Sequence, residues 1–187
     1  MAGELDGRRV AIIATNGVEQ AELEQPRSAV DGAGARSTLI SLSTDPIQAM
    51  NSDIDKGDTF TPDAAISDVS ADDFDALVLP GGTINADQLR QSGDVVSFVQ
   101  AFFAAGKPVG AICHAPWTLV EADLVRGRTL TSYPSLRTDI RNAGGNPVDE
   151  EVVVDEGLVT SRTPKDLDAF CATIVEKFAE RGALTRS

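Results

Sequence analysis

Short apolar runs alternate with helix-like segments along most of the chain, and this alternation restricts the possible folds more than any other feature. The apolar runs have the length of buried strands and occupy residues 10–14, 38–42, 75–79 and 109–112. Helix-like segments at 19–33 and 95–105 lie between them and end at glycines. Such alternation is typical of βαβ units, which build a parallel sheet covered by helices. The sequence therefore predicts an α/β fold with a mainly parallel central sheet.

The remaining segments have weaker patterns. Residues 43–72 are polar, with scattered Asp, Pro, Gly and Ser, and we expect an excursion of short strands or loops there. A short helix is expected over 136–143, and two strands are expected at 152–154 and 158–160 around an Asp-Glu-Gly turn. The final helix is predicted to begin at Thr163, an N-cap residue that is followed by a proline.

Length and composition favour a single domain over residues 1–187. A hydrophobic fraction of 42% can supply the core of one α/β unit. The chain carries 16 Lys and Arg against 29 Asp and Glu, and its net charge of −13 argues against nucleic acid or an anionic membrane surface as a partner. The start of the chain lacks the apolar stretch of a signal peptide, and no run approaches the roughly 18 apolar residues of a membrane span. We therefore expect a cytoplasmic location.

The chain has two cysteines and one histidine, which is too few for a dense metal-binding cluster. The cysteines form no CxxC motif, and we expect no metal and no cofactor. Cys171 falls on an apolar stripe of the final helix, which favours a small core residue over a catalytic or disulfide role.

The other cysteine, Cys113, directly precedes the only histidine, His114, at the point where the apolar run 109–112 ends. Pro116 favours a helix that begins just beyond the pair. A side chain at such a turn is held out at the carboxyl edge of a parallel sheet, where open α/β folds bind ligands. Because helix N-termini favour negative charge, we expect a reactive thiol with a lowered pKa, and His114 as its base or imidazolium partner. The alternatives are a buried structural cysteine and a turn histidine that faces solvent.

Two further groups of residues are expected at the same sheet edge. Gly81 and Gly82 follow the strand at 75–79, and their backbone N–H groups could form an oxyanion hole with the N–H of His114. Glu19 and Glu22 follow the first strand. Taken alone, these features also fit an ordinary Pro-Gly-Gly turn and a solvated acidic first turn of a helix.

Six motifs in one order connect these residues to a known family. They are Ala-Leu-Val-Leu-Pro-Gly-Gly at 76–82, Gly-Lys-Pro-Val at 106–109, Ile-Cys-His-Ala-Pro at 112–116, Gly-Arg at 127–128, Thr-Ser-Tyr-Pro at 131–134 and Glu-Val-Val-Val-Asp at 151–155. Over roughly residues 10–178 the chain resembles the PfpI branch of the ThiJ/PfpI superfamily, whose domain is similar to class I glutamine amidotransferases. The resemblance implies a flavodoxin-like three-layer sandwich, a nucleophile elbow, and a homodimer or higher homo-oligomer.

The resemblance also implies roles for individual residues. Cys113 matches the nucleophile and His114 the adjacent histidine, while Glu22 matches the carboxylate that hydrogen-bonds the thiol, with Glu19 as its companion. Asp87 falls where peptidase members carry a glutamate that reaches the histidine of a neighbouring subunit, and it is shorter by one methylene.

Tyr133 is expected in the pocket, at the position where the deglycase branch of the superfamily carries a histidine and PfpI members do not. Three functions share the resulting site. The first is a stress-associated, PfpI-type cysteine hydrolase, an intracellular protease or amidase that acts through the Cys113 thiolate. The alternatives are a glyoxalase or protein deglycase that uses the same thiolate on an aldehyde, and a non-enzymatic redox sensor in which Cys113 is oxidised. A glutamine amidotransferase is disfavoured because its triad needs a distant histidine.

Overall fold

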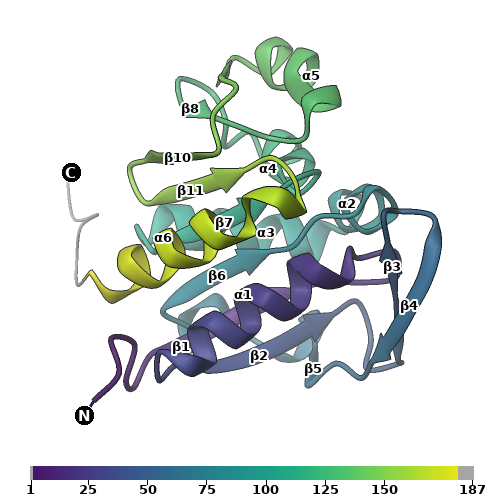
Figure 1. The fold of residues 1–187 in the computed structure, drawn as a ribbon, viewed down its shortest axis with the longest axis vertical. Helices are drawn as coiled ribbons and strands as arrows, with labels where there is room; N and C mark the ends of the chain where they lie inside the picture. The colour runs from purple at the N-terminus through teal and green to yellow at the C-terminus, as the bar shows by residue number, and fades with distance from the viewer. Residues whose placement is uncertain (1, 181–187) are drawn as a thin grey trace.

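The computed structural model describes residues 2–180, in which seven strands form one central sheet (Figure 1). The strands, in sheet order, are β10 (Val152–Asp155), β11 (Leu158–Ser161), β7 (Val109–Ile112), β6 (Ala76–Leu79), β1 (Arg9–Ile13), β2 (Arg36–Ser41) and β5 (Ala64–Ala65). Every neighbouring pair is parallel except the β10–β11 hairpin. The predicted α/β fold with a mainly parallel sheet is confirmed.

Helices cover both faces of this sheet and give the molecule three layers (Figure 1). Helices α1 (Gln20–Gly32) and α6 (Leu167–Ala179) pack side by side on one face. The other face carries α2 (Thr83–Arg90), α3 (Gly93–Ala104), α4 (Pro116–Glu121) and α5 (Arg137–Asn142).

The two-residue period of a strand explains why both layers find a core. Val10 and Ile12 of β1 point into the cluster that holds the apolar side chains of α1 and α6. Ala11 and Ile13 point into the opposite cluster, which holds the phenylalanines of α3. Strands buried on both faces are continuous apolar runs, and this is why their positions were readable from the sequence.

The polar segment 43–72 forms the expected excursion. It contains an antiparallel hairpin of β3 (Ile47–Asn51) and β4 (Asp55–Phe60), followed by β5 and the 3-10 turns η1 (Ile66–Asp68) and η2 (Ala71–Asp73). Backbone bonds attach the hairpin to the loop after β1, because the Met50 N–H donates to the Val18 carbonyl and the Gly17 N–H donates to the Gln48 carbonyl. The tip of the hairpin is thereby held near the carboxyl edge of the main sheet.

Helix α2 is absent from the sequence prediction. Only two of its apolar side chains, Ala86 and Leu89, are buried. The helix is also fixed by a buried polar residue, Asn85, which donates to the carbonyls of Pro80 and Gly81 and accepts from the Thr15 N–H. The remaining short elements are β8 (Thr129–Leu130), β9 (Asn146–Pro147) and η3 (Pro134–Leu136).

The start of the final helix was predicted too early. Residues after Thr163 form a 3-10 turn, η4 (Pro164–Asp166), and α6 begins only at Leu167. The Thr163 side chain makes no capping hydrogen bond to this turn, and the Asp166 carboxylate is held by Arg162. This carboxylate accepts hydrogen bonds from the Arg162 backbone and guanidinium at 2.9–3.0 Å. None of the helices described within residues 2–180 is long and apolar enough to cross a membrane.

Candidate active site

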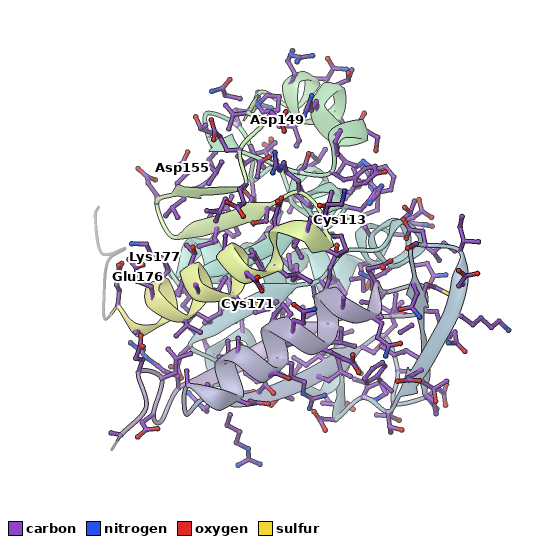
Figure 2. The ribbon with its side chains drawn as sticks, in the orientation of Figure 1. Cys113, Asp149, Asp155, Cys171, Glu176 and Lys177 are labelled. Atoms are coloured by element: carbon purple, nitrogen blue, oxygen red, sulfur yellow. The ribbon has the colours of Figure 1, made fainter. Side chains whose placement is uncertain are left out.

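Cys113 stands in a strained turn between β7 and α4. Its φ of 65° is in the left-handed region, which a residue with a Cβ adopts at a cost of about 1–3 kcal/mol unless its surroundings enforce it. Two backbone bonds enforce it here, because the Cys113 N–H donates to the Ser161 carbonyl and its own carbonyl accepts from the Tyr133 N–H. Figure 2 labels the cysteine at this turn, beyond the end of β7. This is the predicted nucleophile elbow.

Glu22 is buried in the first turn of α1 and reaches the same point. Its Oε2 accepts a hydrogen bond of 2.9 Å from the Gly81 N–H. A Cβ on Gly81 would lie 2.3 Å from Glu22 Oε2 and 2.6 Å from the Cys113 Cβ, so only glycine fits between the two side chains. Burial, together with the charge of Glu19, raises the pKa of Glu22 to about 8. The carboxyl group is therefore largely protonated at neutral pH.

The predicted lowering of the Cys113 pKa is wrong in direction. Burial and the nearby charge of Glu22 raise the pKa of the thiol, while hydrogen bonds from the Gly82 and His114 N–H groups oppose the rise. Helix α4 starts behind the cysteine but has only six residues, and it does not outweigh desolvation. Because both Glu22 and Cys113 have raised pKa values and repel each other when charged, the pair carries at most one negative charge near neutrality.

The oxyanion donors differ in part from the expectation. The N–H groups of Gly82 and His114 point at the Cys113 sulfur. The N–H of Gly81 is occupied by Glu22. Gly82 has a φ of 96°, and a Cβ there would lie 2.2 Å from the Gly17 carbonyl oxygen, so this position also requires glycine.

His114 is 4% exposed, and its imidazole ring lies against the thiol. Its Nδ1 is 3.2 Å from Cys113 Sγ, and its Nε2 is 3.2 Å from Thr83 Oγ1. Tyr133 stacks on one face of the ring, with 4.4 Å between the ring centroids, and Trp117 meets it edge-on at 5.3 Å. Burial lowers the pKa of His114, while the charge of Asp53 acts in the opposite direction. The alternative of a solvent-facing turn histidine does not hold.

Within this chain, the Glu19 and Asp87 carboxylates accept hydrogen bonds from groups other than Cys113 and His114. The Glu19 carboxylate accepts from the backbone N–H groups of Ser52 and Asp53, at 2.7 and 3.1 Å, and so holds the tip of the β3–β4 hairpin. The Asp87 carboxylate accepts from Gln91 on the exposed side of α2. That Asp87 orients the histidine of a neighbouring subunit stays a prediction.

Two residues at the site were missed by sequence reasoning. Thr83 is the first residue of α2, and its hydroxyl and N–H both donate to the Asp53 carboxylate at 2.9 Å. Thr83 carried a usable signal, since it directly follows the Gly81-Gly82 pair at a strand end. Asp53 carried none, because it lies in a polar segment that contains many aspartates.

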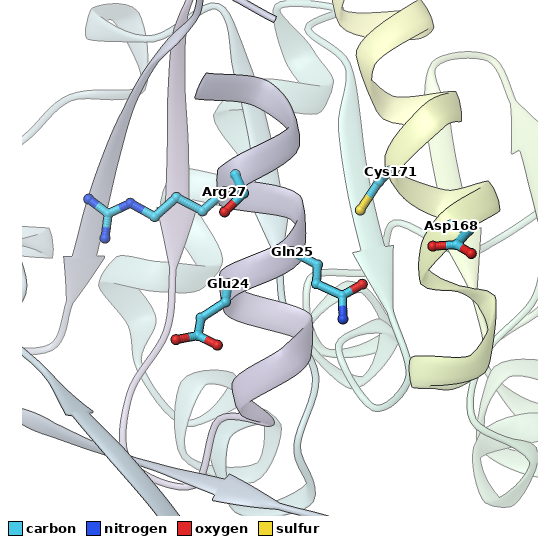
Figure 3. A pocket seen from close by; sticks show the side chains of 6 residues that line it. Glu24, Gln25, Arg27, Asp168 and Cys171 are labelled. Carbon is cyan, nitrogen blue, oxygen red and sulfur yellow. The ribbon is translucent and has the colours of Figure 1, made fainter. Parts of the chain in front are cut away.

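The second cysteine belongs to a different surface. Figure 3 shows a groove between α1 and α6, into which the Cys171 sulfur points. The lining side chains are Glu24, Gln25, Arg27, Ser28, Asp168 and Cys171. Cys171 packs against the core, as predicted, but it is only half-buried. Burial and the charge of Asp168 raise the pKa of its thiol to about 11. The only histidine of the chain contacts Cys113, so Cys171 has no imidazole beside it to take its proton.

No group of three or more His, Cys, Asp or Glu side chains within the described residues 2–180 is arranged to hold a metal ion. What the arrangement provides is a buried thiol, an imidazole in contact with it, a protonated carboxyl group and two backbone donors. These are the components of nucleophilic catalysis at a carbonyl carbon.

Comparisons with known proteins find relatives in both sequence and fold. YraA of Bacillus subtilis (strain 168), provisionally named a cysteine protease, is 43% identical over 164 residues, which cover 87% of this chain and 94% of that protein. General stress protein 18 of the same organism is 41% identical over 174 residues, covering 88% and 94%. The crystal structure of Drosophila melanogaster DJ-1beta superimposes with a TM-score of 0.83 at 29% identity, over 92% of this chain and 90% of that one. The family model described as the DJ-1/PfpI family matches residues 8–177. The chain therefore belongs to the DJ-1/PfpI family.

Proposed function

We propose that this protein is a cysteine hydrolase of the PfpI type that cleaves peptide or amide bonds. The observation that carries the proposal is the 3.2 Å separation between Cys113 Sγ and His114 Nδ1 in a strained elbow. The names of the relatives, a cysteine protease and a general stress protein, support a stress-associated hydrolase. A single domain over 1–187, a homodimer or larger homo-oligomer, and a cytoplasmic location remain predictions.

The reaction begins with transfer of the Cys113 thiol proton to His114 Nδ1. The thiolate then attacks the carbonyl carbon of the substrate, and the Gly82 and His114 N–H groups stabilise the oxyanion that forms. Collapse of this intermediate expels the amine, which takes its proton from His114 Nδ1. Water, deprotonated by the same nitrogen, hydrolyses the thioester and restores the thiol.

Glu22 makes this sequence possible by remaining uncharged. With a pKa of about 8, it is mostly protonated at pH 7 and places no negative charge beside the thiolate. Above pH 8 its carboxylate disfavours the thiolate. We expect activity to fall on the alkaline side as Glu22 ionises.

One observation favours a second function, a glyoxalase or protein deglycase. A protonated carboxyl group beside the thiol can deliver and remove protons on a hemithioacetal formed from an aldehyde such as methylglyoxal. A peptidase has no need of a proton shuttle at that position. The two enzymatic functions are therefore separated by substrate and by the effect of Glu22→Gln.

The test is a substrate panel of fluorogenic peptides, aminoacyl amides and methylglyoxal. Cys113→Ser should reduce hydrolysis of peptides or amides by about 1000-fold or more, while Cys171→Ala, the control at the other thiol, should leave it unchanged. Turnover of methylglyoxal alone, lost in Glu22→Gln, would replace the hydrolase with the glyoxalase function. No turnover of any substrate, with selective oxidation of Cys113 by peroxide in mass spectrometry, would establish the redox sensor instead.

A further inference from the structure

The β3–β4 hairpin brings an acid to the histidine from within the same chain. Asp53, at the hairpin tip, accepts two hydrogen bonds from Thr83, one from the N–H and one from the hydroxyl. The Thr83 oxygen is in turn 3.2 Å from His114 Nε2. A continuous row of contacts thus runs from Asp53 through Thr83 and His114 to the Cys113 sulfur.

The chemistry of each group fixes the direction of these hydrogen bonds. The Thr83 hydroxyl has one proton, and an ionised carboxylate can only accept, so the hydroxyl donates to Asp53. Its oxygen then has only lone pairs left for His114 and must accept from an Nε2–H. A neutral imidazole with its proton on Nε2 has a free lone pair on Nδ1, and this lone pair faces the Cys113 thiol.

We propose that Asp53 and Thr83 are positioning residues that hold His114 as the Nε2–H tautomer and complete a Cys-His-acid relay within one chain. The relay makes an acid from a neighbouring subunit unnecessary. It deepens the hydrolase proposed above, but the tautomer itself does not depend on any substrate. When Nδ1 takes the thiol proton, both ring nitrogens are protonated, and the charge of Asp53 acts through the Thr83 hydroxyl on the imidazolium.

The hairpin tip is built to present this carboxylate. Ser52 and Asp53 have φ values of 55° and 63°, in the left-handed region, and Glu19 fixes both residues by accepting their N–H groups. Glu19, the expected companion of Glu22, therefore supports the relay by fixing the hairpin tip that carries Asp53. The titratable or charged groups around the ring are Cys113 at Nδ1, Glu22 beyond the sulfur, Asp53 through Thr83, Tyr133 on the ring face, and Arg90 over the Trp117 ring.

The chain has one histidine, which makes the tautomer directly measurable. Long-range ¹H–¹⁵N NMR of protein labelled with ¹⁵N-histidine, purified without a histidine tag, should show a proton on Nε2 throughout the titration. Asp53→Asn removes a nearby negative charge and should lower the pKa of His114. Asp55→Asn, an exposed carboxylate on the same hairpin, serves as the control and should leave that pKa unchanged.

Thr83 offers a matched pair of variants. Thr83→Val keeps the shape and the backbone bond to Asp53 but removes the hydroxyl, whereas Thr83→Ser retains the hydroxyl. In a Cys171→Ala background, where iodoacetamide can react only with Cys113, Thr83→Val should slow alkylation at pH 7 by about 10-fold, and Thr83→Ser should stay within about 2-fold of the parent.

Three outcomes decide the proposal. An unprotonated Nε2 in the parent protein overturns it, and so does a Thr83→Val protein with unchanged tautomer and unchanged alkylation rate. The predicted tautomer and alkylation rates without hydrolysis of any peptide or amide would refute the hydrolase function and leave the relay established.

Discussion

Replacing Glu22 with glutamine should stabilise the protein at alkaline pH. Glu22 is fully buried, and its pKa rises from 4.5 to about 8 on folding, so the folded state binds its proton more tightly than the unfolded state does. Stability from this group is therefore largest at acidic pH and is lost as the pH rises toward 8. Glutamine imitates the protonated carboxyl group at every pH, and its carbonyl oxygen can still accept from the Gly81 N–H.

The size of the effect follows from the two pKa values. Between pH 5 and pH 9 the raised pKa of Glu22 should remove about 4 kcal/mol from the free energy of unfolding of the parent protein. Urea unfolding at both pH values measures this loss. The Glu22→Gln variant should lack it, whereas Glu24→Gln, which changes an exposed glutamate in the same helical turn, should follow the parent. Parallel pH dependence of the parent and Glu22→Gln would refute the argument that burial keeps this carboxyl group protonated.

Further substitutions test other parts of the structure. Gly81→Ala should lower the free energy of unfolding by about 1–3 kcal/mol and slow alkylation of Cys113, because the added Cβ has no room. Gly93→Ala, whose Cβ would have no atom within 4 Å, should change neither quantity in the same thermal unfolding and alkylation assays. Asp87→Asn should leave the alkylation rate within about 2-fold of the parent, and a larger loss would restore a role for an acid from a second subunit. Arg162→Met should lower the free energy of unfolding by about 3 kcal/mol at pH 7, because it leaves the buried Asp166 carboxylate without its main partner. Since Arg162 holds the pKa of Asp166 below its usual range, the stability that this pair provides should be lost as the pH falls. In urea unfolding, the free energy of unfolding should therefore fall less between pH 7 and pH 3 in the variant than in the parent.

The sequence was informative wherever local pattern and tertiary environment agree. Strands β1, β6 and β7 are buried on both faces, so their apolar runs reported their positions directly. The elbow was predictable because a cysteine at a strand end is followed by a proline suited to the first turn of a helix. Gly81 and Gly82 were predictable as a turn. The sequence did not indicate that the Gly81 N–H binds Glu22 while the Gly82 N–H points at the Cys113 sulfur.

What could not be predicted depends on long-range packing. The contact between Asp53 and Thr83 joins a hairpin tip to a helix start, and nothing in the polar sequence around Asp53 indicates it. The direction of the Cys113 pKa shift depends on how deeply the thiol is buried and on the facing Glu22, neither of which the local motif reveals. Helix α2 was missed because only two of its apolar side chains are buried and its ordering also comes from the buried amide of Asn85.

The most direct test of the account is to trap the covalent intermediate. Cys171→Ala protein, mixed with an activated peptide ester and quenched in acid, should gain the mass of the acyl group, and peptide mapping should place it on Cys113 as a thioester. The Cys113→Ser/Cys171→Ala protein should gain no thioester and should lose steady-state hydrolysis. Hydrolysis by the Cys171→Ala protein at an undiminished rate with no acyl group on Cys113 would contradict the assignment of this thiol as the nucleophile.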